Sequence, residues 1–307
     1  MKDKLIIGSR GSQLALWQSN FIKERLEETH RGLQVEIKVI KTTGDKILDA
    51  PLAKIGDKGL FVKELEEALL AESVDLAVHS MKDLPTGLPQ GLIIGAVGER
   101  EDPHDVLISR SGLRLEDLAR GGHIGSSSLR RQSQLLHYSD KIRFSDLRGN
   151  LNTRVARVEK GDFDATILAA AGIKRLGWED KITQKIPFDI MLPAVGQGAL
   201  GIEIREKDPD SLSLIRVLDH PLTHNALLAE RALMRRLEGG CQIPIGAYCK
   251  ETGAGKLEIS GMVGSLDGTE LLRSTLSGEP ESPEELGFHL AERLLSMGAG
   301  KILQSIR

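Results

Sequence analysis

The chain has 307 residues, 40% of them hydrophobic, which is enough to bury a sizeable core and to build two or three domains. Its 41 Lys and Arg stand against 44 Asp and Glu, and the net charge of −3 predicts no general attraction to nucleic acid or membranes. No apolar stretch approaches the about 20 residues of a membrane span, and the N-terminal apolar run is too short for a signal peptide. The two cysteines, Cys241 and Cys249, give no disulfide framework, so we expect a cytoplasmic protein.

Strands and helices should alternate along the first 80 residues, as in parallel α/β layers. The first helix is expected to begin at about Ser12, with an apolar face made of Leu14, Trp17, Phe21 and Ile22. Residues 42–59 are rich in glycine and lysine and show no clear periodicity. The other predicted elements are strands over 4–9, 35–40 and 74–78 and a helix over 61–71.

A second unit repeats the plan of the first. Ile7-Gly8-Ser9 before a helix is echoed by Ile124-Gly125-Ser126, and residues 74–78 are echoed by 163–167. Matches this short also arise by chance; if the repeat is real, the chain has two similar α/β lobes that face a cleft. Two segments punctuated by glycine or proline are candidate crossings between the lobes. These segments are 98–103 and 192–196.

A third unit, a small α+β domain, is expected after Pro221. Thr223 is a candidate N-cap of a helix that Gly239-Gly240 would end. Strand-like runs follow, with a hairpin at Asp267-Gly268, and a capping box from Ser282 starts the last helix. The runs cover 247–250, 257–263 and 271–276, and the apolar stripe of the last helix comprises Leu286, Leu290, Leu294 and Met297.

Residues 196–201, GQGALG, match the GxGxxG fingerprint of dinucleotide-binding folds. That fingerprint needs a helix to open at once, so that free backbone N–H groups meet the pyrophosphate. Here residues 202–205, IEIR, alternate as a strand does. We therefore do not expect nicotinamide binding.

Arginines gather between residues 130 and 157 of a chain that is acidic overall. Arg130 and Arg131 stand in the first turn of a predicted helix, where positive charge opposes the helix dipole. With the preceding serines and free N–H groups, they indicate a bound carboxylate or phosphate. Arg10 and Ser12 repeat this pattern in the first lobe. Solvated surface charge is the alternative for any single arginine, and nucleic acid is disfavoured because aromatics make up only 3% of the chain.

Asp83 follows Lys82 just beyond a predicted strand, at the end where open α/β sheets place ligands. A carboxylate among basic residues suits the stabilisation of a cation or the handling of protons. The alternative is that Asp83 caps a turn. Lys54 and Lys58 lie in the 42–59 segment, which is a candidate lid or a plain surface loop.

Cys241 follows the pair Gly239-Gly240, which has no side-chain bulk and permits a left-handed backbone, so its thiol should be well exposed. A hydrolase nucleophile would need a histidine base, and none lies nearby in the sequence. The spacing to Cys249 does not fit paired zinc ligands, and we expect no metal. Cys249, inside a strand-like run, is expected to be a small core residue.

Five motifs of this chain resemble those of the porphobilinogen deaminase family, and the resemblance runs from end to end. Each motif alone is weak, but five in the right order are specific. They are Gly8-Ser9-Arg10-Gly11-Ser12, Val78-His79-Ser80-Met81-Lys82-Asp83-Leu84-Pro85, Ile124-Gly125-Ser126-Ser127-Ser128-Leu129-Arg130-Arg131, Leu147-Arg148-Gly149-Asn150 and Gly239-Gly240-Cys241. One small departure is Ser126, where the family often has threonine, and the hydroxyl is kept.

The resemblance implies an α/β fold with two lobes like those of type 2 periplasmic binding proteins and a third, small α+β domain. The first lobe would comprise residues 1–98 and 199–217, the second 104–193, and the third 221–307, with Cys241 on its entry loop. It also implies a monomeric transferase of tetrapyrrole (haem) biosynthesis. Such an enzyme joins four porphobilinogen molecules head to tail, with loss of ammonia, to give hydroxymethylbilane.

By the same resemblance, a dipyrromethane cofactor built from substrate is attached to Cys241 by a thioether and primes the growing chain. Each pyrrole brings an acetate and a propionate, so the lengthening polyanion needs many basic groups. Asp83 would be catalytic, helping to expel ammonia and stabilising a cation. The implied cofactor-binding residues are Cys241, Lys82, Asp83, Ser128, Arg130 and Arg131. The implied substrate-binding residues are Arg10, Ser12, Lys54, Lys58, Phe61, Ser80, Ser126, Arg148 and Arg154.

A protein of another class, a two-lobed anion-binding or sensor protein without catalysis, would also explain the lobes and the arginines. It would leave Cys241 without a role. Intact mass separates the two hypotheses, because a covalent dipyrromethane adds mass to the chain.

Overall fold

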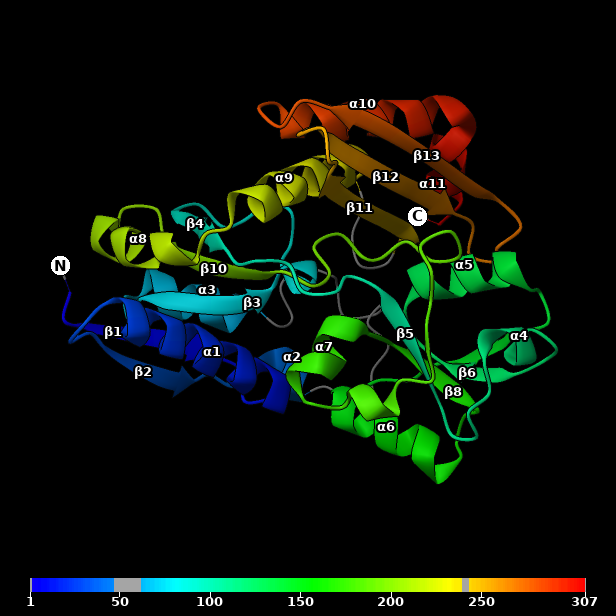
Figure 1. Ribbon diagram of the computed structural model, residues 1–307, viewed down its shortest axis with the longest axis horizontal. Helices are drawn as coiled ribbons and strands as arrows, with labels where there is room; N and C mark the ends of the chain where they lie inside the picture. Colours follow the sequence, from blue (N-terminus) through cyan, green and yellow to red (C-terminus); the bar gives the residue numbers. More distant parts are fainter. Residues whose placement is uncertain (1, 47–61, 239–242, 307) are drawn as a thin grey trace. The chain divides into compact units, whose positions relative to one another are not determined.

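The computed structural model describes residues 2–46, 62–238 and 243–306, and no helix in these ranges is both long and apolar enough to cross a bilayer. The chain forms two compact units. The first consists of Met1–Glu101 and Ala199–His224, and the second of Asp102–Gly198 and Asn225–Arg307. The described residues form three sheets, one in the first unit and two in the second (Figure 1).

The first unit is built on a five-stranded sheet of order β2-β1-β3-β10-β4. β1 lies parallel to β2 and β3, whereas β10 runs antiparallel between β3 and β4. β10 begins at Leu200, inside the GxGxxG match, so a strand opens there and not the helix that a dinucleotide fingerprint needs. The strands are β1 (Lys4–Ser9), β2 (Gln34–Val39), β3 (Leu76–Ser80), β4 (Leu92–Val97) and β10 (Leu200–Arg205).

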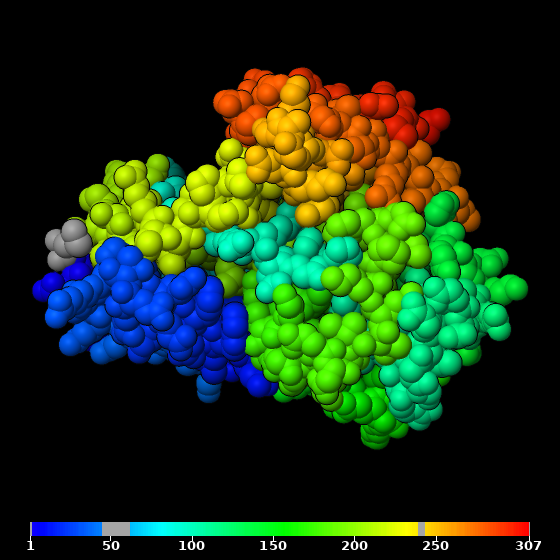
Figure 2. All heavy atoms as spheres, viewed as in Figure 1, coloured from blue at the N-terminus to red at the C-terminus, as the bar shows by residue number. Residues whose placement is uncertain are grey.

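Helix α1 (Gln13–Thr29) begins where predicted, but its predicted apolar face is only partly right: Ile22 is buried in the core, whereas the two aromatic residues are not. Trp17 and Phe21 are 37% and 38% exposed and stack on each other with ring centroids 5.4 Å apart. The buried face includes the polar residues Gln18 and Ser19, whose hydrogen bonds to strand ends satisfy them. Figure 2 shows the surface of this N-terminal segment in blue. The other helices of the unit are α2 (Thr43–Lys46), α3 (Lys63–Leu70) and α8 (Pro209–Ile215).

The second sheet, of order β7-β6-β8-β5-β9, has the same plan as the first. β6 lies parallel to β7 and β8, and β5 runs antiparallel to β8, as β10 does to β3. The predicted repeat is therefore confirmed: β6 and β8 correspond to β1 and β3. The strands are β5 (Asp105–Ser109), β6 (His123–Gly125), β7 (Arg143–Ser145), β8 (Ala165–Ala169) and β9 (Gln184–Lys185). The accompanying helices are α4 (Leu115–Leu118), α5 (Leu129–Tyr138), α6 (Leu151–Lys160) and α7 (Ala170–Arg175).

The third sheet is an antiparallel meander covered by helices, as predicted for a small α+β part. Gly268 has φ +72° at the predicted hairpin, and Cys249 is buried in the core. Three details are wrong: the helix assigned to Thr223 already begins at Pro221, Ser282 is the N-cap of the last predicted helix but makes no side-chain capping hydrogen bond, and Met297 is 44% exposed. The elements are α9 (Pro221–Arg236), β11 (Ile245–Glu251), β12 (Leu257–Gly264), β13 (Leu271–Gly278), α10 (Pro283–Leu294) and α11 (Gly300–Ile306).

These sheets confirm the expected fold class of two like α/β lobes and a small α+β part. The strand β10 belongs to the first sheet although it follows the second in sequence, so the first lobe is discontinuous. Contacts join the second and third sheets into one compact unit. The finer division into three domains, 1–98 with 199–217, 104–193 and 221–307, remains a prediction.

Candidate functional site

In the first unit, five predicted site residues gather at the end of the sheet where the parallel strands finish; we call this end the carboxyl edge. β1 and β3 are parallel neighbours, so their carboxyl ends lie side by side. Arg10 and Ser12 follow β1. Ser80 ends β3, and Lys82 and Asp83 lie in the 3₁₀ turn that comes next. The structure therefore brings together five residues that are separated by up to 73 positions in the sequence.

Helix α1 fixes both strand ends at this edge. The Nε2 atom of Gln18 donates a hydrogen bond of 2.8 Å to Oγ of Ser80, and Ser19 Oγ donates one of 2.8 Å to Ser9 Oγ. The hydroxyl of Ser12 accepts from the backbone N–H of Ala15 and so caps the helix. The carboxylate of Asp83 is exposed at the end of the turn. The role of Gln18 was not predicted, because a glutamine next to an aromatic residue gives no signal in the sequence that its side chain is buried and bonded to a strand end.

In the second unit, the corresponding edge lies beyond β6 and β7, which are also parallel neighbours. Ser126 is buried, and its Oγ accepts from the N–H of Ser128, the N-cap residue of α5. Ser127 Oγ accepts from the N–H of Leu147 at 3.1 Å and so joins the two loops of this edge. Arg148 and Arg154 follow Leu147; Nε of Arg154 donates to the carbonyl of Gly149 at 2.9 Å.

The buried carboxylate of Asp105 is the partner of Arg130 and Arg131. Nη1 of Arg130 lies 2.7 Å from Oδ2 of Asp105, and Nη2 of Arg131 lies 2.7 Å from Oδ1. The side chains of the two arginines are 6% and 7% exposed, and that of Asp105 is fully buried. The expectation that these arginines find an anion only in a ligand is therefore wrong. Asp105, at the start of β5, supplies one from within the protein.

Further polar groups complete this cluster. Gln197 Nε2 donates to Oδ1 of Asp105 at 3.1 Å, and Arg131 Nη1 donates to the carbonyl of Ile167 at 2.8 Å. Burial alone would raise the pKa of Asp105, but the charges and hydrogen bonds of the two arginines outweigh burial and hold this pKa well below its usual range. Two guanidinium groups against one carboxylate leave the buried cluster with a net positive charge of one. A buried net charge is costly, which favours an anionic ligand beside it.

Several predicted site residues lie outside the described residues. They are Lys54, Lys58, Phe61 and Cys241. Among the described residues, no group of three or more His, Cys, Asp or Glu side chains could hold a metal ion.

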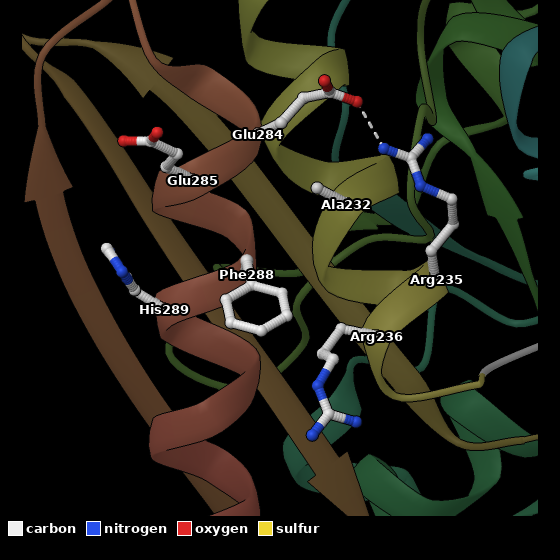
Figure 3. A pocket seen from close by; sticks show the side chains of 7 residues that line it. All are labelled: Ala232, Arg235, Arg236, Glu284, Glu285, Phe288 and His289. Atoms are coloured by element: carbon white, nitrogen blue, oxygen red, sulfur yellow. Dashed lines mark hydrogen bonds and ion pairs between the residues drawn. The ribbon is translucent and has the colours of Figure 1, made fainter.

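A groove on the second unit contains none of the predicted site residues. It lies between α9 and α10 and has a cavity volume of about 460 Å³ (Figure 3). Arg235 and Glu284 point toward each other across it and form an ion pair, while Arg236 lies over the ring of Phe288 at 5.6 Å. Because both arginines already have acceptors or ring partners on α10, we assign this groove no role in the site.

Comparison with known proteins covers nearly the whole chain. The family model "Porphobilinogen deaminase, dipyromethane cofactor binding domain" matches residues 5–213, and "Porphobilinogen deaminase, C-terminal domain" matches residues 225–296. A porphobilinogen deaminase of Carboxydothermus hydrogenoformans is 54% identical over 307 residues, which are all of this chain and 98% of that protein. One of Gloeobacter violaceus is 53% identical over 310 residues, covering all of this chain and 94% of that protein.

Similarity to solved structures is weaker. The BenM effector binding domain with benzoate has a TM-score of 0.43 and 14% identity, over 70% of this chain and 90% of that one. The aliphatic sulphonate binding protein SsuA of Escherichia coli has a TM-score of 0.41 and 12% identity, over 78% of this chain and 71% of that one. These values are too low to support any conclusion about a ligand.

The two like sheets, with basic residues beyond the carboxyl ends of their strands, define a two-lobed α/β protein. The matches over the full length go further: the chain belongs to the porphobilinogen deaminase family.

The described residues fit the dipyrromethane group that this family carries. The group presents carboxylates, and the second unit offers the net positive charge around Asp105 together with the N-terminus of α5. The side chain of Ser128, at the N-cap of that helix, makes no capping hydrogen bond, which leaves its hydroxyl for another acceptor. The donor set therefore matches the chemistry of the cofactor.

Proposed function

We propose that this protein joins four porphobilinogen molecules head to tail, with loss of ammonia, to hydroxymethylbilane on a dipyrromethane primer. The single observation that carries the proposal is identity of 50% or more to porphobilinogen deaminases over the entire chain. The geometry supports it, because basic and hydroxyl groups gather at equivalent edges of two like sheets. A substrate with two carboxylates per pyrrole needs such groups.

We assign the attachment of the primer to Cys241, because this cysteine completes the last of the five family motifs. When bound, the dipyrromethane supplies the end on which the pyrrole chain grows. Lys82, Asp83 and Ser128 would hold it, together with the arginine pair that Asp105 orders. The buried Cys249 is unsuited to carry such a group, because its side chain lies in the core of the third sheet.

The remaining predicted residues would hold the substrate and the growing chain. Asp83 would stabilise positive charge that develops on porphobilinogen as ammonia leaves, and its exposure at the end of its turn supports this role. Lys54 and Lys58 would act from the 42–59 segment, with Phe61 beside it. The substrate-binding set is Arg10, Ser12, Lys54, Lys58, Phe61, Ser80, Ser126, Arg148 and Arg154. We further propose that the protein is a cytoplasmic monomer.

Intact mass spectrometry and a turnover assay with porphobilinogen test the proposal together. The purified chain should carry the mass of one dipyrromethane and convert porphobilinogen to hydroxymethylbilane. Cys241→Ser should fold but lose both the added mass and activity, because a serine hydroxyl is far less ionised than a thiol. Cys249→Ser, the matched control, should keep both. The bare mass in the wild-type chain would favour a binding protein without catalysis, and added mass on a Cys249 peptide would refute the assignment.

A further inference from the structure

His79 and Glu203 form a buried hydrogen bond within the sheet of the first unit. The Nε2 atom of His79 lies 2.9 Å from Oε2 of Glu203, and the side chains are 4% and 0% exposed. His79 is on β3, and Glu203 is on β10, 124 residues further along the chain. None of the roles proposed above uses either residue.

This bond lies directly before the segment that carries Ser80, Lys82 and Asp83. In the antiparallel ladder His79 is opposite Gly201, so it reaches Glu203 diagonally on one face of the sheet. Side chains alternate along a strand, so Ser80 belongs to the other face, where it receives Gln18 of α1. The last two residues of β3 are therefore fixed from both faces.

Gly201 provides a second anchor on the same strand. A Cβ atom at this position would lie 2.2 Å from Sδ of Met81, so only glycine leaves room for the methionine. Met81 is 2% exposed, and its N–H donates to the carbonyl of Ala199 at 3.0 Å. Met81 opens the 3₁₀ turn Met81–Asp83. β10 thus holds the start of this turn through His79 and through Met81.

A second buried carboxyl group, that of Glu66, lies near this bond. Oε1 of Glu203 and Oε1 of Glu66, on α3, are both buried without a hydrogen-bond partner among the described residues. Burial raises the pKa of Glu66, and the charge of Glu203 raises it further, while His79 opposes this rise. Glu67, also on α3, adds a small effect in the same direction, and β4 contributes only apolar residues and glycine. Glu66 is therefore a neighbouring carboxyl group that can be changed without removing either partner of the bond.

We propose that His79 and Glu203 are positioning residues, which hold the end of β3 against β10 and thereby set the place of the turn that carries Lys82 and Asp83. Neither residue touches substrate. The proposal rests on the proposed function, because it assigns the pair a task in that reaction. The hydrogen bond between the two side chains is directional and buried, so it can fix the position of the turn. Such precision matters, because displacement of a catalytic group by about 1 Å can cost about 100-fold in rate.

The test compares Glu203→Gln and His79→Gln with the wild-type chain. Both variants keep the approximate size of the side chain but replace one partner of the hydrogen bond between His79 and Glu203. We expect kcat to fall about tenfold or more, with KM changed far less, because the turn that carries Asp83 shifts while the substrate-binding groups of other segments, such as Arg148 and Arg154, remain in place. Hydrogen exchange at the amides of Met81 and Leu84, which donate within this region, should become faster. Glu66→Gln is the matched control: it removes a neighbouring carboxylate that lies outside the bond, and it should resemble the wild type.

Each outcome decides the proposal. Wild-type kcat and exchange in both variants would overturn it, as would a loss of activity in Glu66→Gln equal to theirs. If Glu203→Gln does not fold, His79→Gln carries the test, and unfolding of both would assign the pair a purely structural role. A wild-type chain that does not convert porphobilinogen would refute the proposed function instead, and the exchange data would still decide whether the pair holds the turn.

Discussion

Asp105 determines what the arginine pair of the second unit can do. A guanidinium group in the first turn of a helix opposes the helix dipole, and two such groups side by side repel each other. The carboxylate of Asp105 lies between Arg130 and Arg131 and offsets both effects. The arginines are thereby fixed in the absence of any ligand, while the cluster keeps a net positive charge for an acidic one.

We predict that Asp105→Asn lowers the free energy of unfolding by about 3–5 kcal/mol at pH 7, the usual cost of breaking a buried ion pair on one side. Urea unfolding measures this value. Arg157→Leu is the control, because Arg157 is 46% exposed and pairs with Asp162 at the surface, and it should cost less than about 1 kcal/mol. An equal loss of unfolding free energy in the two variants would show that the buried ion pairs of Asp105 contribute no more to stability than a surface pair.

The pKa shift of Asp105 predicts how the stability difference between the wild type and Asp105→Asn changes with pH. The pKa of Asp105 is depressed in the folded protein, so its contribution to stability is fully present above its unfolded pKa of about 4. It is lost as pH falls below that value toward the folded pKa. The difference in unfolding free energy between wild type and Asp105→Asn should therefore be constant from about pH 7 to 5 and shrink below about pH 4. A difference that grows on acidification would contradict the assigned direction.

Asp83 differs from Asp105 because its carboxylate is exposed, at the end of the turn that follows β3. Asp83→Asn keeps the size of the side chain and removes the charge and the proton acceptor. We predict a fall in kcat of about 100-fold or more, the scale of losing a preorganised electrostatic contact to the transition state. Intact mass and the melting temperature should remain those of the wild type. Near-normal turnover in this variant would remove Asp83 from the mechanism.

At the scale of elements, the sequence predicts strands better than helix faces. The apolar run of β1 was predicted residue for residue, because a buried parallel strand is a continuous apolar segment. The buried face of α1 was predicted only in part: Ile22 was expected there, but Gln18 and Ser19 are polar and are buried with hydrogen bonds to other elements. The role of Asp105 was missed for a similar reason: its partners lie 25 and 26 residues away and meet it only in the folded sheet.

Close packing at the end of β6 yields a prediction at this scale. A Cβ atom at Gly125 would lie 2.8 Å from Leu147 and 2.9 Å from Phe163, both in the core. Gly125→Ala should therefore destabilise the protein by about 1–3 kcal/mol through overpacking. Gly253→Ala meets no atom within 4 Å and should change stability by less than about 0.5 kcal/mol. Thermal unfolding of both variants tests this prediction. Unchanged stability in Gly125→Ala would show that Leu147 and Phe163 can move to make room for the added methyl group.

At the scale of the whole molecule, the route of the chain explains why the two sheets share one plan. The chain leaves the first sheet after β4, enters the second through β5, and returns to the first through β10. β5 and β10 hold equivalent antiparallel positions in their sheets. The crossing strands are therefore structural members of the lobes that they connect. β10 adjoins β3, which ends in Ser80, and β5 itself begins with Asp105, the partner of the arginine pair.

This route predicts the effect of ending the chain at Gly198. The truncated protein lacks β10, the strand that pairs with β4 and with one side of β3. The amides of β4 that donate to β10 should then lose their protection from hydrogen exchange, because β10 is the only strand that pairs with β4 among the described residues. The second sheet keeps all five strands, which lie within residues 105–185, and should retain more protection. Adding a peptide of residues 199–218 should restore protection at β4. Unchanged exchange at β4 in the truncated chain would mean that the first sheet is stable without its returning strand.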